Sequence, residues 1–170
     1  MVKNFIKLIP AAALMVVVGC SSQPSFVVKG TTNAETETVY LTSGKDTLVA
    51  APVVNGAFEA TLALDETTPN TVYVRDGSRQ SAMLFVENGT VNYSKTEDGI
   101  KLSGAPLNAA YQAYQDKMAE LSAAFRKAET EEEAEALYEQ SDNLDKEFYE
   151  QNLDNYIGLY QLQSLQYSME

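Results

Sequence analysis

The stretch LVAAPVVNGAFEATLAL, residues 48–64, predicts two short β-strands joined by a tight turn. Asn55 and Gly56 both tolerate a positive φ angle, which a two-residue hairpin turn requires. After the turn, small or apolar residues recur at every second position from Phe58 to Leu64, so they share one face of a strand. We therefore expect a β-hairpin here, with one face turned toward a core.

The same pattern extends in both directions from this hairpin. Two more pairs of turn residues, Asn88-Gly89 and Asp98-Gly99, predict two further hairpins. The apolar run Met83–Val86 predicts a central strand with both faces covered. Short strands at close spacing favour an antiparallel β-sandwich, or a partly open barrel, over a parallel α/β sheet. The predicted strands cover residues 26–28, 36–42, 48–54, 57–64, 71–75, 82–87, 90–96 and 100–103.

At Gly104 the spacing of apolar residues changes from strand-like to helical. Pro106 suits the first turn of a helix, and Thr130 with Glu133 forms a capping-box pattern that predicts the start of a second helix. Because the link between them is short, the two helices should form an antiparallel hairpin. A break at Leu153-Asp154 precedes a third, shorter helix. The apolar stripes of the first two helices are Leu107, Tyr111, Tyr114, Met118, Leu121, Phe125 and Ala128, and then Ala134, Leu137, Ser141, Leu144 and Phe148.

The predicted fold class is therefore α+β. An antiparallel β-sandwich or partly open barrel over residues 25–104 precedes an antiparallel helical hairpin and a third short helix over residues 105–170. A chain of this length suffices for one medium domain or two small modules.

Residues 1–19 have the features of a bacterial export signal. Lys3 and Lys7 make the first segment positive, and the apolar run that follows is too short to span a bilayer about 30 Å thick. Gly19 directly precedes Cys20, which is the only cysteine. This pattern resembles the lipobox of bacterial lipoproteins.

The lipobox resemblance implies cleavage between Gly19 and Cys20, and diacylglycerol and palmitate-type acyl chains on Cys20. Several acyl chains on one residue give stable anchoring. Residues 20–24 would then be a lipidated tether, and we expect the mature protein in the cell envelope, on the outer membrane facing the periplasm. The alternative is an uncleaved hydrophobic anchor with an incidental cysteine.

Composition excludes several classes of function. Cleavage would remove Lys3 and Lys7, leaving 10 basic and 24 acidic side chains, a formal charge of −14 that repels nucleic acids. There is no histidine, so the usual general base and the commonest transition-metal ligand are missing. Cys-x-x-Cys pairs and glycine-rich phosphate loops are also absent. We predict no enzyme activity, no cofactor and no metal, although a Ser–Lys or two-carboxylate site stays open.

The acidic run from Glu129 to Glu135 has two interpretations. The carboxylates could bind a divalent cation, or they could stabilise a helix N-terminus through the helix dipole. Successive residues spread around a helix and do not converge on one ion, so we favour the second interpretation.

Other candidate sites involve aromatic, apolar and hydroxyl side chains. Exposed tyrosines could stack on sugars, but tyrosines on an apolar stripe more often fill a core. The third helix is apolar on several sides, which predicts a protein partner that contacts it. Thr47, in Asp46-Thr47-Leu48, fits a bacterial O-glycosylation pattern, but three residues often match by chance, so we favour an unmodified threonine. The tyrosines are Tyr111, Tyr114, Tyr156, Tyr160 and Tyr167, and the apolar positions of the third helix are Ile157, Leu159, Leu162 and Leu165.

Several segments together resemble one family, the N-terminal domain of unknown function numbered 4369. They are FVVKG (26–30), VYL (39–41), VNGAF (54–58), LFVENG (84–89) and LSGAPLN (102–108), and DNYIG (154–158) resembles the connector that follows the domain. The resemblance implies an exported lipoprotein of Gram-negative bacteria. It also implies a following thioredoxin-like domain of the AhpC/TSA, thiol-disulfide oxidoreductase type. No Cys-x-x-Cys occurs here, so no catalytic residue of that family carries over.

Three hypotheses of function follow from the sequence. The first is a non-catalytic, membrane-tethered lipoprotein module that binds or scaffolds. The second is the front portion of a thiol-disulfide oxidoreductase whose thioredoxin-like domain is missing. The third is a surface glycan-binding lipoprotein, against which the absence of tryptophan counts.

Overall fold

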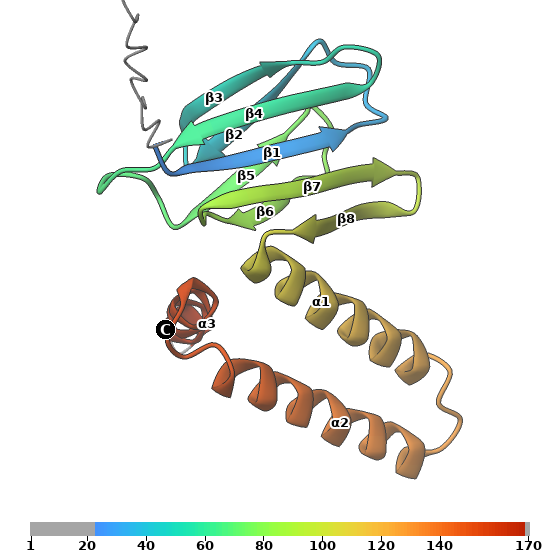
Figure 1. Cartoon of the computed structure of the whole chain (residues 1–170). Coiled ribbons are helices and arrows are strands. Elements are labelled where there is room, and N and C mark those ends of the chain that lie inside the picture. The colour runs from blue at the N-terminus through green and yellow to red at the C-terminus, as the bar shows by residue number, and fades with distance from the viewer. Residues whose placement is uncertain (1–22, 169–170) are drawn as a thin grey trace, which may run out of the picture.

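A β-sandwich and a group of helices make up the structure, a computed structural model that describes residues 23–168 (Figure 1). Gly19 and Cys20 lie outside the described residues. The strands are β1 (Ser25–Thr31), β2 (Thr38–Ser43), β3 (Asp46–Pro52), β4 (Ala57–Ala63), β5 (Thr71–Arg75), β6 (Ala82–Phe85), β7 (Gly89–Thr96) and β8 (Gly99–Gly104). The helices are α1 (Pro106–Phe125), α2 (Glu131–Glu150) and α3 (Tyr156–Ser168). The α+β class and all the predicted elements are confirmed.

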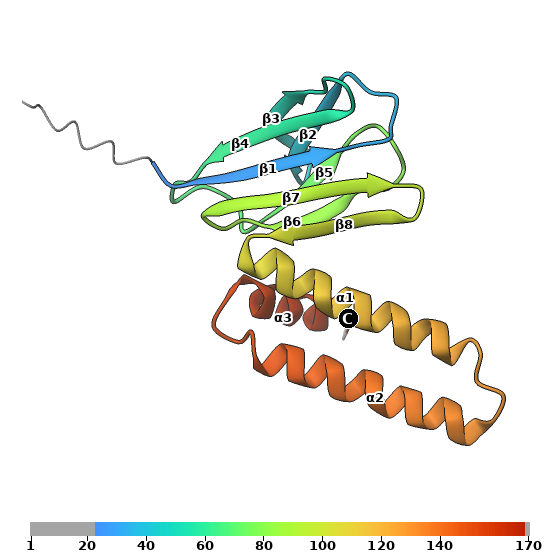
Figure 2. The same ribbon diagram turned by 45° about the vertical axis from the view of Figure 1, so that its right-hand side comes forward.

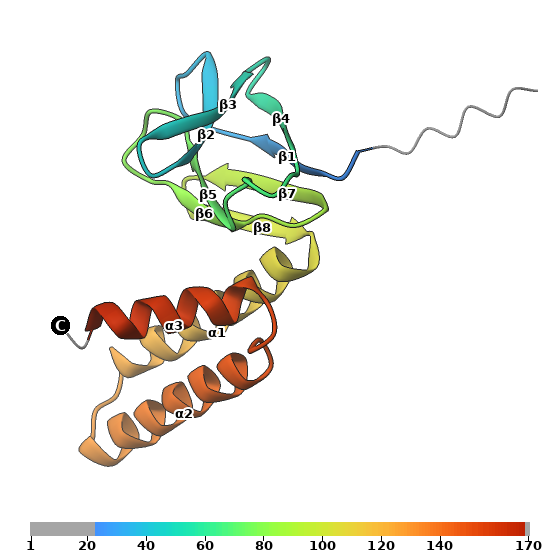
Figure 3. The ribbon, with the colours of Figure 1, turned by 90° about the vertical axis from the view of Figure 1, so that its left-hand side faces the viewer.

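Two four-stranded sheets pack face to face, in the orders β4-β1-β7-β8 and β3-β2-β5-β6 (Figures 1 and 3). Neighbouring strands are antiparallel except β1 and β7, which are parallel. The sheets do not close into a barrel. Alternate side chains of both sheets meet between them in a core of fifteen buried residues, among them Phe26, Val39, Val72 and Val91, each of them 0% exposed.

Two of the three predicted hairpins are wrong as strand pairs. Asn55 and Gly56 do form a tight turn with positive φ angles of 53° and 77°, closed by a single bridge between Val54 and Ala57. However, β3 and β4 enter different sheets, so the turn carries the chain from one layer to the other. The chain also crosses between layers at Asn88-Gly89, and of the three only Asp98-Gly99 joins paired strands. Turn residues fix local backbone angles, whereas burial of the inward faces decides which strands pair.

The prediction that β6 is a central strand is also wrong, because β6 lies at the edge of its sheet. Both faces are nevertheless covered: Leu84 points into the sandwich core and Phe85 into a second cluster with the helices. The free backbone edge is covered too. The side-chain amide of Asn108 accepts a hydrogen bond from Phe85 N at 3.0 Å and donates one to Phe85 O at 2.8 Å, as a neighbouring strand would.

The first turns of α1 are bonded to the sandwich. Glu87 Oε1 accepts hydrogen bonds from Leu107 N and Asn108 N, which are unpaired donors at the helix start. One turn later, Gln112 Oε1 accepts from Leu102 N on β8 at 2.8 Å. Asn108 and Gln112, four positions apart, thus each bond one backbone position on an edge strand, Phe85 of β6 and Leu102 of β8. These contacts fix the direction in which α1 leaves the sandwich.

Gly104 makes the passage from β8 into α1 possible. Its φ angle is +100°, and an added Cβ would collide with Thr90 O. Pro106 occupies the first helical turn as predicted.

The helical hairpin is confirmed, with α2 returning antiparallel beside α1 (Figure 2). Thr130 caps α2 by accepting a hydrogen bond from Glu133 N at 3.2 Å. The Glu133 carboxylate accepts from Glu129 N, one residue before the cap. Glu131 and Glu132 lie in the first turn, where carboxylates favour the helix start. The capping interpretation of the acidic run is therefore confirmed.

Candidate interaction surface

The hairpin of α1 and α2 leaves most of its apolar stripe only half-buried. Asn108 and Phe148 are the fully buried residues of the two helices, and both lie at the end near the sandwich. At the far end, Phe125 is 51% exposed and Tyr138 is 62% exposed. Two helices packed side by side shield only the seam between them, so the flanks of the stripe face solvent.

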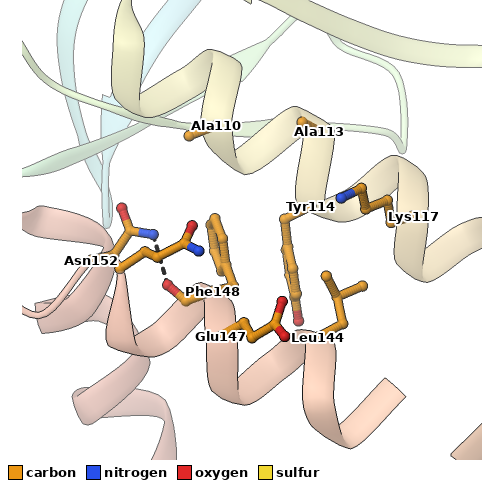
Figure 4. A pocket seen from close by; sticks show the side chains of 9 residues that line it. Ala110, Ala113, Tyr114, Lys117, Leu144, Glu147, Phe148 and Asn152 are labelled. Carbon is orange, nitrogen blue, oxygen red and sulfur yellow. Dashed lines mark hydrogen bonds between the residues drawn. The ribbon is translucent and has the colours of Figure 1, made fainter. Parts of the chain in front are cut away.

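A cleft of about 330 Å³ lies in the near half of the hairpin, and its side chains are drawn in Figure 4. The rings of Tyr114 and Phe148 stack with their centroids 4.2 Å apart. The Tyr114 hydroxyl donates to Asp145 Oδ1 at 2.5 Å. Burial, and then the Asp145 carboxylate, raise the pKa of Tyr114, so its hydroxyl stays protonated and keeps this bond. The ring stacking and this hydrogen bond therefore join α1 to α2 beside the cleft.

The far half of the hairpin has an open groove on one side. This tip groove has a volume of about 230 Å³. It is lined by Met118, Leu121, Phe125, Leu137, Tyr138 and two serines. On the opposite side of the seam a larger hollow has a mixed lining that includes Lys117, Glu120 and Glu147. Figures 1 and 2 show α3 near the sandwich, away from the tip of the hairpin.

Three residues of the DNYIG segment fix the position of α3. Asn155 Oδ1 caps the helix by accepting from Ile157 N at 2.9 Å. Ile157 is fully buried beside Phe85 and Phe148. An added Cβ on Gly158 would collide with Asn152 O, so only glycine allows this approach.

The predicted partner surface on α3 needs one correction. Ile157 is wrong as a contact residue, because it is buried against the sandwich and α2. Leu159 and Leu162 are 41% and 56% exposed and remain available. The side chain of Leu165 lies outside the described residues.

Most of the described candidate tyrosines pack against other aromatic rings. Tyr111 and Tyr160 meet Phe85 edge-on, with centroids 5.2 Å and 5.9 Å away, and Tyr114 stacks as described above. Tyr156 is 42% exposed. The side chain of Tyr167 lies outside the described residues. The packing interpretation thus holds for three of these tyrosines, and nothing here assembles a flat platform for sugars from the described ones.

A cluster that the sequence did not reveal is buried at one end of the sandwich. Lys95 Nζ lies 2.7 Å from Asp76 Oδ2, and both side chains are at most 5% exposed. Thr32 and Ser78 donate further hydrogen bonds to the same carboxylate. Burial alone would raise the pKa of Asp76, but these bonds outweigh it and hold the pKa well below its ordinary value.

This cluster brings together the serine and lysine of a possible Ser–Lys site. Lys95 Nζ donates a hydrogen bond to Ser78 Oγ. A Ser–Lys pair needs a neutral lysine that accepts the serine proton. Here Lys95 Nζ donates to the Asp76 carboxylate as well as to Ser78 Oγ, so the geometry supports a structural ion pair. Among the described residues, no three histidine, cysteine, aspartate or glutamate side chains gather as a metal site.

Thr47 lies on β3 with an exposed side chain, so an enzyme could reach it. Both interpretations of Thr47, glycosylated and unmodified, are compatible with this position. No helix in the described part of the chain is long and apolar enough to cross a membrane.

The two family-like segments LFVENG and LSGAPLN meet in space through the Glu87 and Asn108 bonds. A comparison with family models matches residues 26–111 to a domain of unknown function, DUF4369. This chain belongs to the DUF4369 family. The DUF4369 match includes the first turns of α1, in agreement with the hydrogen bonds that join them to the sandwich. No curated protein and no solved structure matches the chain.

Proposed function

We propose that this DUF4369 protein is a non-catalytic lipoprotein module of the cell envelope that binds a protein partner through its helical region. The observation that carries the proposal is the contrast in burial. The sandwich closes its own core, whereas the helices present Phe125, Tyr138 and Leu162 at more than half exposure. Exposed apolar side chains gathered on one part of a protein mark interaction surfaces.

The lipid tether rests on the sequence around Gly19 and Cys20. In the structure, β1 begins at Ser25 at one end of the front sheet, and the hairpin tip lies at the far end of the molecule (Figure 1). A chain anchored through Cys20 would therefore present the helices away from its attachment point. Fractionation of cells tests the tether: Cys20→Ala should move the protein from the membrane fraction to the soluble fraction. Retention in the membrane fraction would show that lipid on Cys20 does not anchor it.

Photo-crosslinking in living cells tests the binding function. A photoreactive aromatic amino acid at position 138 or 162 should give a discrete protein adduct. The same residue at Val54, which is 64% exposed on the sandwich, is the matched control and should give none. Adducts at position 54 without adducts at 138 and 162 would place any partner on the sandwich and contradict the proposal.

The absence of catalysis has its own test. The purified protein should not reduce insulin with a dithiol as electron donor, because Cys20 is its only thiol and is lipidated in this proposal. Measurable turnover would contradict the non-catalytic assignment.

A further inference from the structure

The tip groove has a lining of apolar side chains and two serines, and acidic residues of α2 flank it. Its floor comes from Met118, Leu121 and Leu137. On α2, residues three, four or seven positions from Tyr138 share its face of the helix. Besides Ala134 and Ser141, those residues are Glu131, Glu135, Asp142 and Asp145. Four carboxylates therefore follow the same edge of α2 as Tyr138.

The wall contributed by α1 is different. Gln115, Ala119 and Ser122 lie along it, with Arg126 at the tip. This wall is uncharged over most of its length. The groove therefore favours an apolar ligand whose positive charges lie toward α2.

Charge restricts the occupants of this groove. Residues 105–170 contain 14 acidic and four basic side chains, against ten and six in residues 25–104. A second copy would bring one acidic stripe against another, which is unfavourable. Anionic lipid headgroups would be repelled for the same reason.

We propose that the tip groove binds a cationic amphipathic helix of a partner protein. Apolar residues at helical spacing on the partner fill the groove between Leu121 and Leu137, as helices dock in other apolar grooves. Lysine or arginine side chains on its flank pair with the carboxylates of α2. This proposal rests on the proposed function, and it names the chemistry of the partner.

Peptide binding to the full-length protein in zwitterionic lipid nanodiscs tests the proposal. The probe is a labelled synthetic amphipathic peptide with leucines on one face and lysines on the other. Its counterpart has glutamate in place of every lysine. The lysine peptide should bind, more weakly as salt rises, and the glutamate peptide should not. Empty nanodiscs give the background, and equal binding of both peptides would overturn the proposal.

Two triple variants locate the site. The groove variant Glu131→Gln/Glu135→Gln/Asp142→Asn should lower the affinity for the lysine peptide by about tenfold. This is the effect expected for the loss of three exposed charge pairs.

The matched control removes the same number of charges from the other side of α2, through Glu132→Gln, Glu147→Gln and Glu150→Gln. Glu147 lines the hollow on the opposite side of the seam. Glu132 shares the first turn with Glu131, so both variants lose a favourable helix-dipole contact. The control should keep at least half of the affinity. An equal loss in both variants would show non-specific charge attraction and overturn the proposal.

The outcome separates this inference from the function that it rests on. Crosslinks at position 138 in cells with no binding of the lysine peptide would leave the binding module intact and refute its cationic ligand. Self-association of the protein that Tyr138→Glu abolishes would instead identify a second copy as the occupant, and would also refute it.

Discussion

The sandwich and the helical hairpin differ in how completely they bury their apolar side chains. The sandwich joins two sheets, each with an apolar face, and closes fifteen buried residues between them. The hairpin has two helices of 20 residues each with continuous apolar stripes, yet its buried residues are Asn108 and Phe148 at the near end. A sheet pair can enclose a core, whereas two helices leave two open flanks. The sandwich therefore holds most of the buried apolar core, and the hairpin leaves apolar side chains exposed to solvent.

The largest expected effect comes from truncating the sandwich core. Phe26→Ala should cost about 3–5 kcal/mol of unfolding free energy, because Phe26 is fully buried between the sheets. The matched change in the hairpin, Phe125→Ala, should cost less than about 1 kcal/mol. Urea denaturation followed by circular dichroism measures both. Similar costs would refute the division between the two regions.

The junction between the regions should come next. Asn108→Ala leaves the N–H and C=O groups of Phe85 unpaired, which should cost about 3 kcal/mol. Gln112→Ala, which removes one bond to Leu102 N in a less buried place, should cost about 1 kcal/mol. Hydrogen exchange should show lost protection at β6 and the start of α1 in the first variant. Full protection there would show that the amide does not join the regions.

The buried ion pair predicts an acid sensitivity of the sandwich. The pKa of Asp76 is lowered by folding, so its stabilisation is present above the unfolded pKa near 4 and is lost as the pH falls below it. We expect a loss of roughly 2 kcal/mol from this group between neutral and strongly acidic pH. The double variant Asp76→Leu/Lys95→Met should lose less stability over the same range. An unchanged pH profile in the double variant would contradict the role of this pair.

The smallest effect on stability should be the most informative about function. Tyr138→Ala removes a side chain that is 62% exposed and should change the unfolding free energy by less than about 0.5 kcal/mol. The same variant should lose most of the lysine-peptide binding, because Tyr138 lines the tip groove. Thermal melts and the nanodisc assay separate the two quantities. A large fall in the melting temperature would show that Tyr138 stabilises the fold as a core residue does. It would contradict the contrast between the sandwich core and the exposed hairpin.

The sequence by itself determined the strands and helices, and the point near Gly104 at which strands give way to helices. Alternation placed each strand within three residues of its observed bounds, and the helical stripes with the Thr130 cap placed the hairpin. It also indicated the family through segments that a family model then matched. These features depend on residues close together in the chain, so their physics is local. The apolar stripe of the tip groove was visible too, although its exposure was not.

Only the tertiary structure decided the partners of those elements. The turn at Asn55-Gly56 formed as predicted but joined two layers, because its backbone angles specify a reversal and not the sheet that each strand enters. β6 became an edge strand because a side chain 23 positions away, Asn108, supplies the missing hydrogen bonds. The Asp76–Lys95 pair lies 19 positions apart and depends on the stacking of the sheets. Burial is a sum over contacts between distant segments, so a stripe of apolar residues does not reveal which part of it stays open.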